Sequence, residues 1–164
     1  MGWNVREIGY GMWGMAGWTG SEDRESLKSL QHAVDLGCNF FDTAWAYGEG
    51  HSEKLLGQII RANPHKTLYA ASKIPPKNRR WPGQREFSVD DCFPPDYTEE
   101  YVHTSLENVG VAKLDLMQFH IWEDHWLDDE RLLKAIDKMR TSGAVRAVGI
   151  RLNRWEPGDG GRAG

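Results

Sequence analysis

The alternation of short apolar strands with single amphipathic helices constrains the fold of this chain most. Helical apolar spacing follows the strands, as in Leu27, Leu30 and Val34. A strand, a helix and a second strand in this order form a parallel pair through a right-handed crossover. The sequence therefore predicts an α/β fold with a parallel sheet. The strands are predicted at residues 5–12, 39–44, 67–73, 113–120 and 145–150.

Each predicted helix begins at a residue whose side chain can accept hydrogen bonds from the free N–H groups of the first turn. The first and fourth helices should end at Gly37 and Gly143, because glycine readily closes a helix. Residues 74–97 form a connection longer than the ~12–15 residues usual in compact domains, which indicates a functional or disordered loop. The predicted N-caps are Ser21, Ser52, Thr98 and Asp128 or Asp129.

Four polar residues stand at or just past the ends of predicted strands, and the carboxyl ends of parallel strands meet at one rim of a barrel. There Asp42 and Lys73 can form a partly buried ion pair. The lysine cation favours the phenolate of Tyr47, so we expect a lowered Tyr47 pKa. Tyr47 would donate a proton to a carbonyl oxygen, and a histidine would be a second donor that orients the substrate. The four residues are Asp42, Tyr47, Lys73 and His120.

The position of these residues after strand ends is typical of a (β/α)8 barrel of the TIM type. A complete barrel takes ~250 residues, whereas this chain has 164. It shows about the first four βα units and a fifth strand, so we expect a single partial barrel domain over residues 1–164. The glycine-rich tail, residues 151–164, has no helical period and is expected to be disordered. This end resembles a truncation or a shifted reading frame.

Plainer interpretations compete with the catalytic one. Taken singly, Lys73 is explained as an ion-pair partner and Tyr47 as a loop aromatic; together with two further strand-end residues they favour catalysis. The glycines at 9–14 match G-x-G-x-x-G, but the next helix begins only near residue 21, too far away for a dinucleotide turn. Four residues could be imagined as metal ligands, yet their spacing fits no metal-binding helix and no metal is expected. They are His120, Glu123, Asp124 and His125.

Charge and composition exclude several classes of partner. The formal net charge of −4 argues against a nucleic-acid partner. No apolar run approaches the ~18–20 residues of a membrane span, and the first residues lack a signal-peptide core. The two cysteines, Cys38 and Cys92, are too few for a disulfide scaffold and have no metal-motif spacing. We therefore expect a cytoplasmic protein with neither a membrane nor a nucleic-acid partner.

Five ordered motifs resemble those of the aldo-keto reductase family. They surround the second strand and helix, the third-strand lysine, the fourth-strand histidine with the segment before it, and the fifth strand. The resemblance runs from about residue 8 to about residue 157. The motifs are FDTAWAYGEGHSEKLLG, ASKI, SLENVGVAKLDL, LDLMQFHIW and VRAVGI.

The resemblance implies an enzyme that reduces aldehydes and ketones with NADPH, or less often NADH. It maps the family's catalytic tetrad onto the four strand-end residues, with Tyr47 as proton donor. After the fifth strand the family usually has a serine followed closely by an asparagine, both of which contact the nicotinamide. Here Arg151 replaces the small hydroxyl residue, and Asn153 remains as a cofactor-binding candidate. The resemblance places four tryptophans in the loops around the substrate: Trp18, Trp45, Trp81 and Trp122.

Two functions from different classes follow. The first is the N-terminal part of an NADPH-dependent aldo-keto reductase, expected to turn over little because the family's last strands hold most of the cofactor. The second is a non-catalytic half-barrel that forms a homo-oligomer through its open sheet edges. A barrel isomerase or a metal-dependent hydrolase would need phosphate or metal ligands that the sequence does not display.

Overall fold

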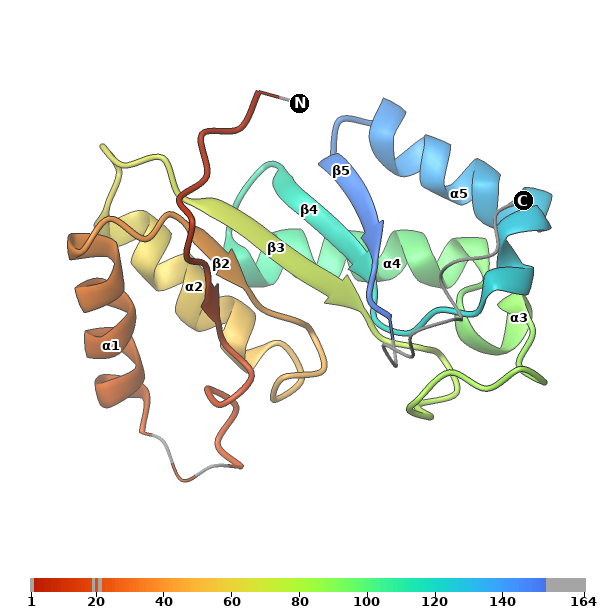
Figure 1. The fold of residues 1–164 in the computed structure, drawn as a ribbon, viewed down its shortest axis with the longest axis horizontal. Helices are drawn as coiled ribbons and strands as arrows, with labels where there is room; N and C mark the ends of the chain where they lie inside the picture. Colours follow the sequence, from red (N-terminus) through yellow and green to blue (C-terminus); the bar gives the residue numbers. More distant parts are fainter. Residues whose placement is uncertain (1, 19, 21, 153–164) are drawn as a thin grey trace.

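A five-stranded parallel sheet organises the chain in the computed structural model, which describes residues 2–18, 20 and 22–152 (Figure 1). The strands lie in the order β1-β2-β3-β4-β5, and each neighbouring pair is parallel. Sequential strands joined by helical crossovers confirm the predicted α/β class and form about half of a (β/α)8 barrel sheet. The strands are β1 Tyr10–Gly11, β2 Phe40–Asp42, β3 Tyr69–Ile74, β4 Leu114–Phe119 and β5 Val145–Ile150.

The helices cover one face of the sheet, with α2 and α4 behind it and α1 and α5 toward its two edges (Figure 1). Successive strand residues point to opposite faces, and burial follows that alternation on β2 and over residues 116–119 of β4. Phe41, Met117 and Phe119 are fully buried, whereas Asp42 and Gln118 on the other face are half-buried. The helices are α1 Asp23–Asp35, α2 His51–Ala62, α3 Val89–Cys92, α4 Pro95–Val109, the 3-10 helix η1 Asp124–Asp128 and α5 Glu130–Thr141.

The first strand is much shorter than predicted. The sequence predicts a strand over residues 5–12, but only Tyr10–Gly11 pairs with β2. The preceding backbone uses side chains as partners instead of a neighbouring strand. The Asn4 N–H donates to Tyr69 Oη over 3.1 Å, and the Arg6 N–H donates to Asn39 Oδ1 over 2.9 Å. An alternating apolar pattern does not tell whether the backbone will bond a neighbouring strand or nearby side chains.

One predicted helix cap is confirmed: Asp129 precedes α5, and its carboxylate accepts from the N–H of Arg131 over 2.9 Å. The Ser52 cap is wrong, because α2 begins at His51 and Gly50 precedes it with a φ of +87°. Ser52 is instead fully buried, and its hydroxyl accepts a hydrogen bond from Thr43 Oγ1 over 2.7 Å.

The third predicted helix begins earlier than expected. The Thr98 cap is wrong, because α4 begins at Pro95. Proline suits the first turn of a helix, where its missing N–H would have no intrahelical partner. The Thr98 hydroxyl donates to the Pro94 carbonyl over 3.1 Å within that turn. The other proposed cap, Ser21, lies outside the described residues.

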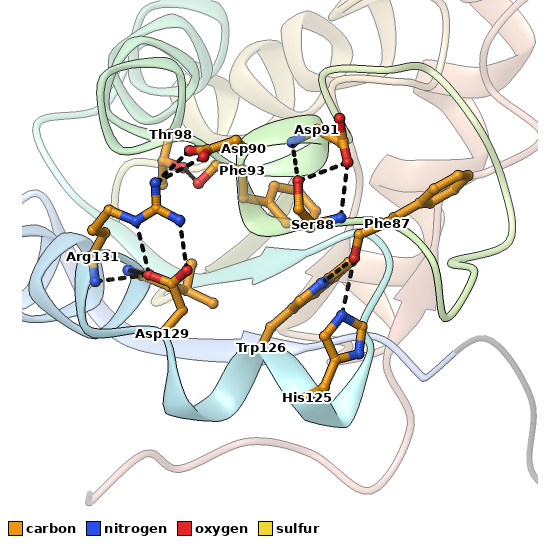
Figure 2. Close-up of polar contacts among 11 residues, drawn as sticks. Phe87, Ser88, Asp90, Asp91, Phe93, Thr98, His125, Trp126, Asp129 and Arg131 are labelled. Atoms are coloured by element: carbon orange, nitrogen blue, oxygen red, sulfur yellow. Dashed lines mark hydrogen bonds and ion pairs between the residues drawn. The ribbon is translucent and has the colours of Figure 1, made fainter.

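The long connection between β3 and α4 is ordered and held against the loop after β4 (Figure 2). It contains α3, which has a capping box between Ser88 and Asp91. The Phe87 carbonyl accepts from Trp126 Nε1 over 2.8 Å and lies 3.0 Å from a ring nitrogen of His125. This segment is therefore fixed beside the carboxyl ends of the strands.

Gly57 lies where α2 passes close to the end of α4. A Cβ atom there would lie 2.2 Å from the Val109 carbonyl oxygen. That contact is with backbone, so the two helices would have to separate to admit a methyl group.

We expect Gly57→Ala to destabilise the fold by about 1–3 kcal/mol, the usual cost of overpacking a core. Helix propensity alone would give the opposite sign, because alanine is favoured over glycine by about 1 kcal/mol. Urea unfolding measures the difference. Gly11→Ala is the control, since its Cβ would meet no atom within 4 Å. A Gly57→Ala protein more stable than the parent would contradict the close approach.

Candidate active site

The structure brings the four strand-end residues into one cluster at the carboxyl side of the sheet. Asp42 ends β2, Lys73 is the penultimate residue of β3, His120 follows β4, and Tyr47 lies in the loop after β2. Lys73 Nζ lies 2.8 Å from Asp42 Oδ2 and 5.1 Å from the centroid of the Tyr47 ring. The rings of Tyr47 and His120 pack edge to face, with their centroids 5.7 Å apart. The predicted convergence of these four residues is therefore present.

Lys73 is a buried cation held by two acceptors. Its side chain is 4% exposed, and Nζ donates to Asp42 Oδ2 over 2.8 Å and to the Thr43 carbonyl over 2.7 Å. Burial lowers the pKa of Lys73, while the charge of Asp42 and its hydrogen bond act in the opposite direction. The predicted ion pair between neighbouring strands is confirmed.

The prediction that this cation lowers the pKa of Tyr47 is wrong. The pKa of Tyr47 is raised, first by burial of the phenol and then by the negative charge of Asp42. The charge of Lys73 is balanced by Asp42 in the ion pair, so burial determines the direction of the pKa shift of Tyr47. Tyr47 consequently holds its proton at neutral pH.

His120 is neutral in this environment. It is 5% exposed, and burial is the first cause that lowers its pKa to about 3, followed by the charges of Lys73 and Arg151. Its Nδ1 atom is buried and has no hydrogen-bond partner among the described residues. An unpaired buried imidazole nitrogen is costly, which is consistent with a site shaped to receive a polar ligand group.

Two of the four predicted tryptophans contact the tetrad. Trp18 meets the Tyr47 ring edge-on at 6.3 Å, and Trp81 meets the His120 ring at 5.9 Å. Trp18 is 50% exposed and Trp81 41% exposed, so both present indole surface to solvent beside the cluster.

The other two tryptophans pack against different aromatic rings. Trp45 meets Tyr101 edge-on at 5.0 Å, and the Arg79 guanidinium lies 4.4 Å from the Trp45 ring centroid. Trp122 is buried and meets Trp126 edge-on at 5.9 Å. A role of these two in substrate binding stays a prediction.

Glu53 is a buried charged group that the sequence reasoning missed. Its side chain is fully buried on α2, where it accepts from Ser72 Oγ over 2.5 Å and from Asn108 Nδ2 over 2.8 Å. Burial raises its pKa. Because Ser72 precedes Lys73 on β3, Glu53 fixes the strand that bears the lysine. The sequence does carry a signal for this role. Glu53 lies one turn before Leu56, so an acidic residue falls on the apolar face of a predicted helix.

Two further predictions from the sequence concern a cofactor-binding residue and a set of imagined metal ligands. Asn153, the cofactor-binding candidate, lies outside the described residues. Within residues 2–18, 20 and 22–152, no three His, Cys, Asp or Glu side chains group closely enough to hold a metal ion. His125, imagined as a ligand, contacts the Phe87 carbonyl instead. Over the same residues, no helix is long and apolar enough to cross a membrane.

Comparison with known proteins agrees with this architecture. Residues 7–157 match the model of the Aldo/keto reductase family, and the chain belongs to that family. It is 29% identical to the aldo-keto reductase yakc of Schizosaccharomyces pombe, whose name carries NADP(+), over 89% of this chain and 42% of that protein. It is 31% identical to a D-threo-aldose 1-dehydrogenase of Pseudomonas sp, over 78% of this chain and 44% of that protein.

A solved structure shows the same arrangement of strands and helices. The glycerol dehydrogenase of Gluconobacter oxydans superposes with a TM-score of 0.73 at 27% identity. The match covers 92% of this chain and 46% of the dehydrogenase. The chain therefore spans about half the length of the relatives and structures that it matches.

The depressed pKa of His120 should make the folded state sensitive to acid. Its folded-state pKa of about 3 lies below the ordinary value of 6.5, so the unfolded chain binds one more proton between these values. Stability contributed by neutral His120 is thus lost as pH falls below 6.5. Between pH 7 and pH 5 we expect the parent chain to lose about 2 kcal/mol more than His120→Gln. Urea unfolding at both pH values measures this loss. His65→Gln, at an exposed residue, should behave as the parent does, and equal losses in all three proteins would contradict a buried neutral His120.

Proposed function

We propose that the cluster of Asp42, Tyr47, Lys73 and His120 reduces the carbonyl group of small aldehydes or ketones with NADPH, or less often NADH. The observation that carries this proposal is the contact of a protonated phenol with both a buried ammonium group and a neutral imidazole. Such a set can donate a proton and bind an oxygen without a metal ion. Membership of the aldo/keto reductase family supports the same chemistry.

The cofactor would lie against the residues of this cluster. The buried Nδ1 of His120, which has no partner in the described part of the chain, fits a polar group of such a ligand. Tyr47 and His120 would hold the nicotinamide end, and Asn153, which lies outside the described residues, is the further residue that we propose to bind the cofactor. When bound, the cofactor supplies the hydride that reduces the carbonyl carbon.

Residues of the chain would donate the proton and stabilise the charge that its transfer leaves. Tyr47 Oη donates it to the carbonyl oxygen, and its raised pKa keeps it protonated up to neutral pH and beyond. Lys73, held cationic by Asp42, stabilises the negative charge left on the phenol. His120 donates a hydrogen bond from its neutral ring and orients the carbonyl. Four tryptophans complete the proposed substrate mouth: Trp18, Trp45, Trp81 and Trp122.

Turnover by the 164-residue chain should be low. Its described strands form one side of a barrel, so NADPH would contact few groups and bind weakly. We also place the protein in the cytoplasm, a reducing compartment that suits the free thiols of Cys38 and Cys92.

Replacement of Tyr47 by phenylalanine tests the proton donor. We expect the slow NADPH oxidation that a small aldehyde stimulates to fall at least 100-fold in Tyr47→Phe, the usual minimum for a lost general acid. Tyr10→Phe is the matched control, because that hydroxyl bonds Ser29 away from the cluster. Undiminished oxidation in Tyr47→Phe would exclude the proposed donor. Tight NADPH binding with fast turnover, lost in Tyr47→Phe, would instead contradict the low activity of this chain.

The second candidate function, self-association, is favoured by the open edges of the sheet. β1 and β5 each pair on one side only among the described strands. Ile8, just before β1, is 77% exposed, and Ile150, the last residue of β5, is 43% exposed. Unpaired strand edges with exposed apolar side chains favour association with another chain.

Sedimentation velocity tests this candidate. We expect dimers or larger species at micromolar concentration, and less association in Ile150→Lys, because a charge opposes edge pairing. Leu133→Lys is the control, since Leu133 is similarly exposed, at 45%, but lies on α5. A folded monomer at all concentrations would rule out self-association.

A further inference from the structure

Arg151 stands at the rim of the candidate active site. It follows β5 directly, and its backbone N–H donates to the Phe119 carbonyl over 3.0 Å. This bond continues the register in which Phe119 pairs with Ile150. Arg151 is therefore the β5 neighbour of His120, on the same side of the sheet.

The charge of Arg151 has no acidic partner among residues 2–18, 20 and 22–152. No carboxylate lies within ion-pair distance of it in the described chain, whereas Arg131 pairs with Asp90 and Arg146 pairs with Asp115. Arginine carries its charge at any pH at which the protein folds. An exposed arginine without an acidic partner beside a reactive cluster is suited to an anionic ligand.

Among the described residues, the carboxylate of this cluster, Asp42, is held in an ion pair. Its partner Lys73 offsets that negative charge, and His120 is neutral. Burial raises the pKa of Tyr47 and lowers that of His120; the charge of Arg151 opposes the first shift and adds to the second, which places it within electrostatic reach of both rings. Within the described part of the chain, the reactive groups thus lie within electrostatic reach of one arginine that has no acidic partner there.

Flat apolar surface lies beside this charge. Trp81 contacts the His120 ring and Trp18 contacts the Tyr47 ring, and both indoles are about half exposed. A ligand with a planar apolar part and an anionic end could contact both the indole surface and the guanidinium group.

We propose that Arg151 binds a carboxylate or phosphate group of the substrate, which makes anionic carbonyl compounds the substrate class of this site. The inference rests on the proposed carbonyl reduction, because it assigns the anion to the molecule that carries the carbonyl. Arginine matches such groups with two parallel hydrogen bonds, which a lysine can replace only as a point charge.

Binding of two aldehydes of similar shape tests the proposal without requiring turnover. Ligand-observed NMR titration compares 4-carboxybenzaldehyde with the uncharged 4-methylbenzaldehyde. The parent chain should bind the carboxylate more tightly. Arg151→Gln should raise its Kd about tenfold, the loss expected for a hydrogen bond between charged groups. Arg151→Lys should restore part of that loss, and the Kd of 4-methylbenzaldehyde should change less than twofold in both variants.

Arg140→Gln is the matched control, because Arg140 is exposed in the last turn of α5, outside the cluster. It should leave both affinities unchanged. Equal weakening of the two aldehydes in Arg151→Gln, or no preference of the parent chain for the carboxylate, would overturn the proposal. So would a loss of NADPH affinity in Arg151→Gln with unchanged binding of the carboxylate, since the anion would then be a cofactor phosphate.

Failure of the proposed reduction is measured separately. Tyr47→Phe should keep the preference for 4-carboxybenzaldehyde while losing NADPH oxidation. An Arg151-dependent preference without any reduction of either aldehyde would refute the reductase function and leave anion binding by Arg151 established. Reduction of 4-methylbenzaldehyde with no preference for the carboxylate would refute only the role of Arg151.

Discussion

The ion pair between Lys73 and Asp42 is the interaction on which the rest of the site depends. A lysine whose side chain is only 4% exposed loses most of its hydration, a cost that is offset only by close acceptors. Asp42 and the Thr43 carbonyl provide them at 2.8 and 2.7 Å. These contacts join β2 to β3 at their carboxyl ends. They also set the ammonium group over the Tyr47 ring, so the geometry of the phenol follows from the pair.

A second buried network supports this pair from the helix side of the sheet. Glu53 on α2 links Ser72 on β3 with Asn108 on α4; its bond to Ser72 is buried and its bond to Asn108 is partly buried. Strand residues alternate between faces, so Lys73 reaches the reactive cluster while the preceding Ser72 reaches Glu53. One strand therefore carries two polar anchors on opposite faces. Together they hold the lysine more rigidly than either would alone.

The sequence was informative wherever pattern and local chemistry agreed. The fifth strand matches its predicted bounds, 145–150, and Asp129 caps α5 as its side chain suggested. It was misleading where tertiary contacts decided. Ser52 resembles a cap but is buried against Thr43, and the first strand shortens because side chains of Tyr69 and Asn39 satisfy its backbone. The gathering of the tetrad followed from topology, whereas the raised pKa of Tyr47 depends on burial that no spacing encodes.

The shared carbonyl of Phe87 has a consequence for how such a site can change. It joins the segment after β3, which carries Trp81, to the 3-10 helix η1 in the loop after β4. Arg131 strengthens the same junction by bonding Asp90 on one side and Asp129 on the other. These hydrogen bonds and ion pairs therefore tie the two loops to each other. An insertion or deletion in either would displace both, so new specificities would arise more readily through side-chain replacements than through changes in loop length.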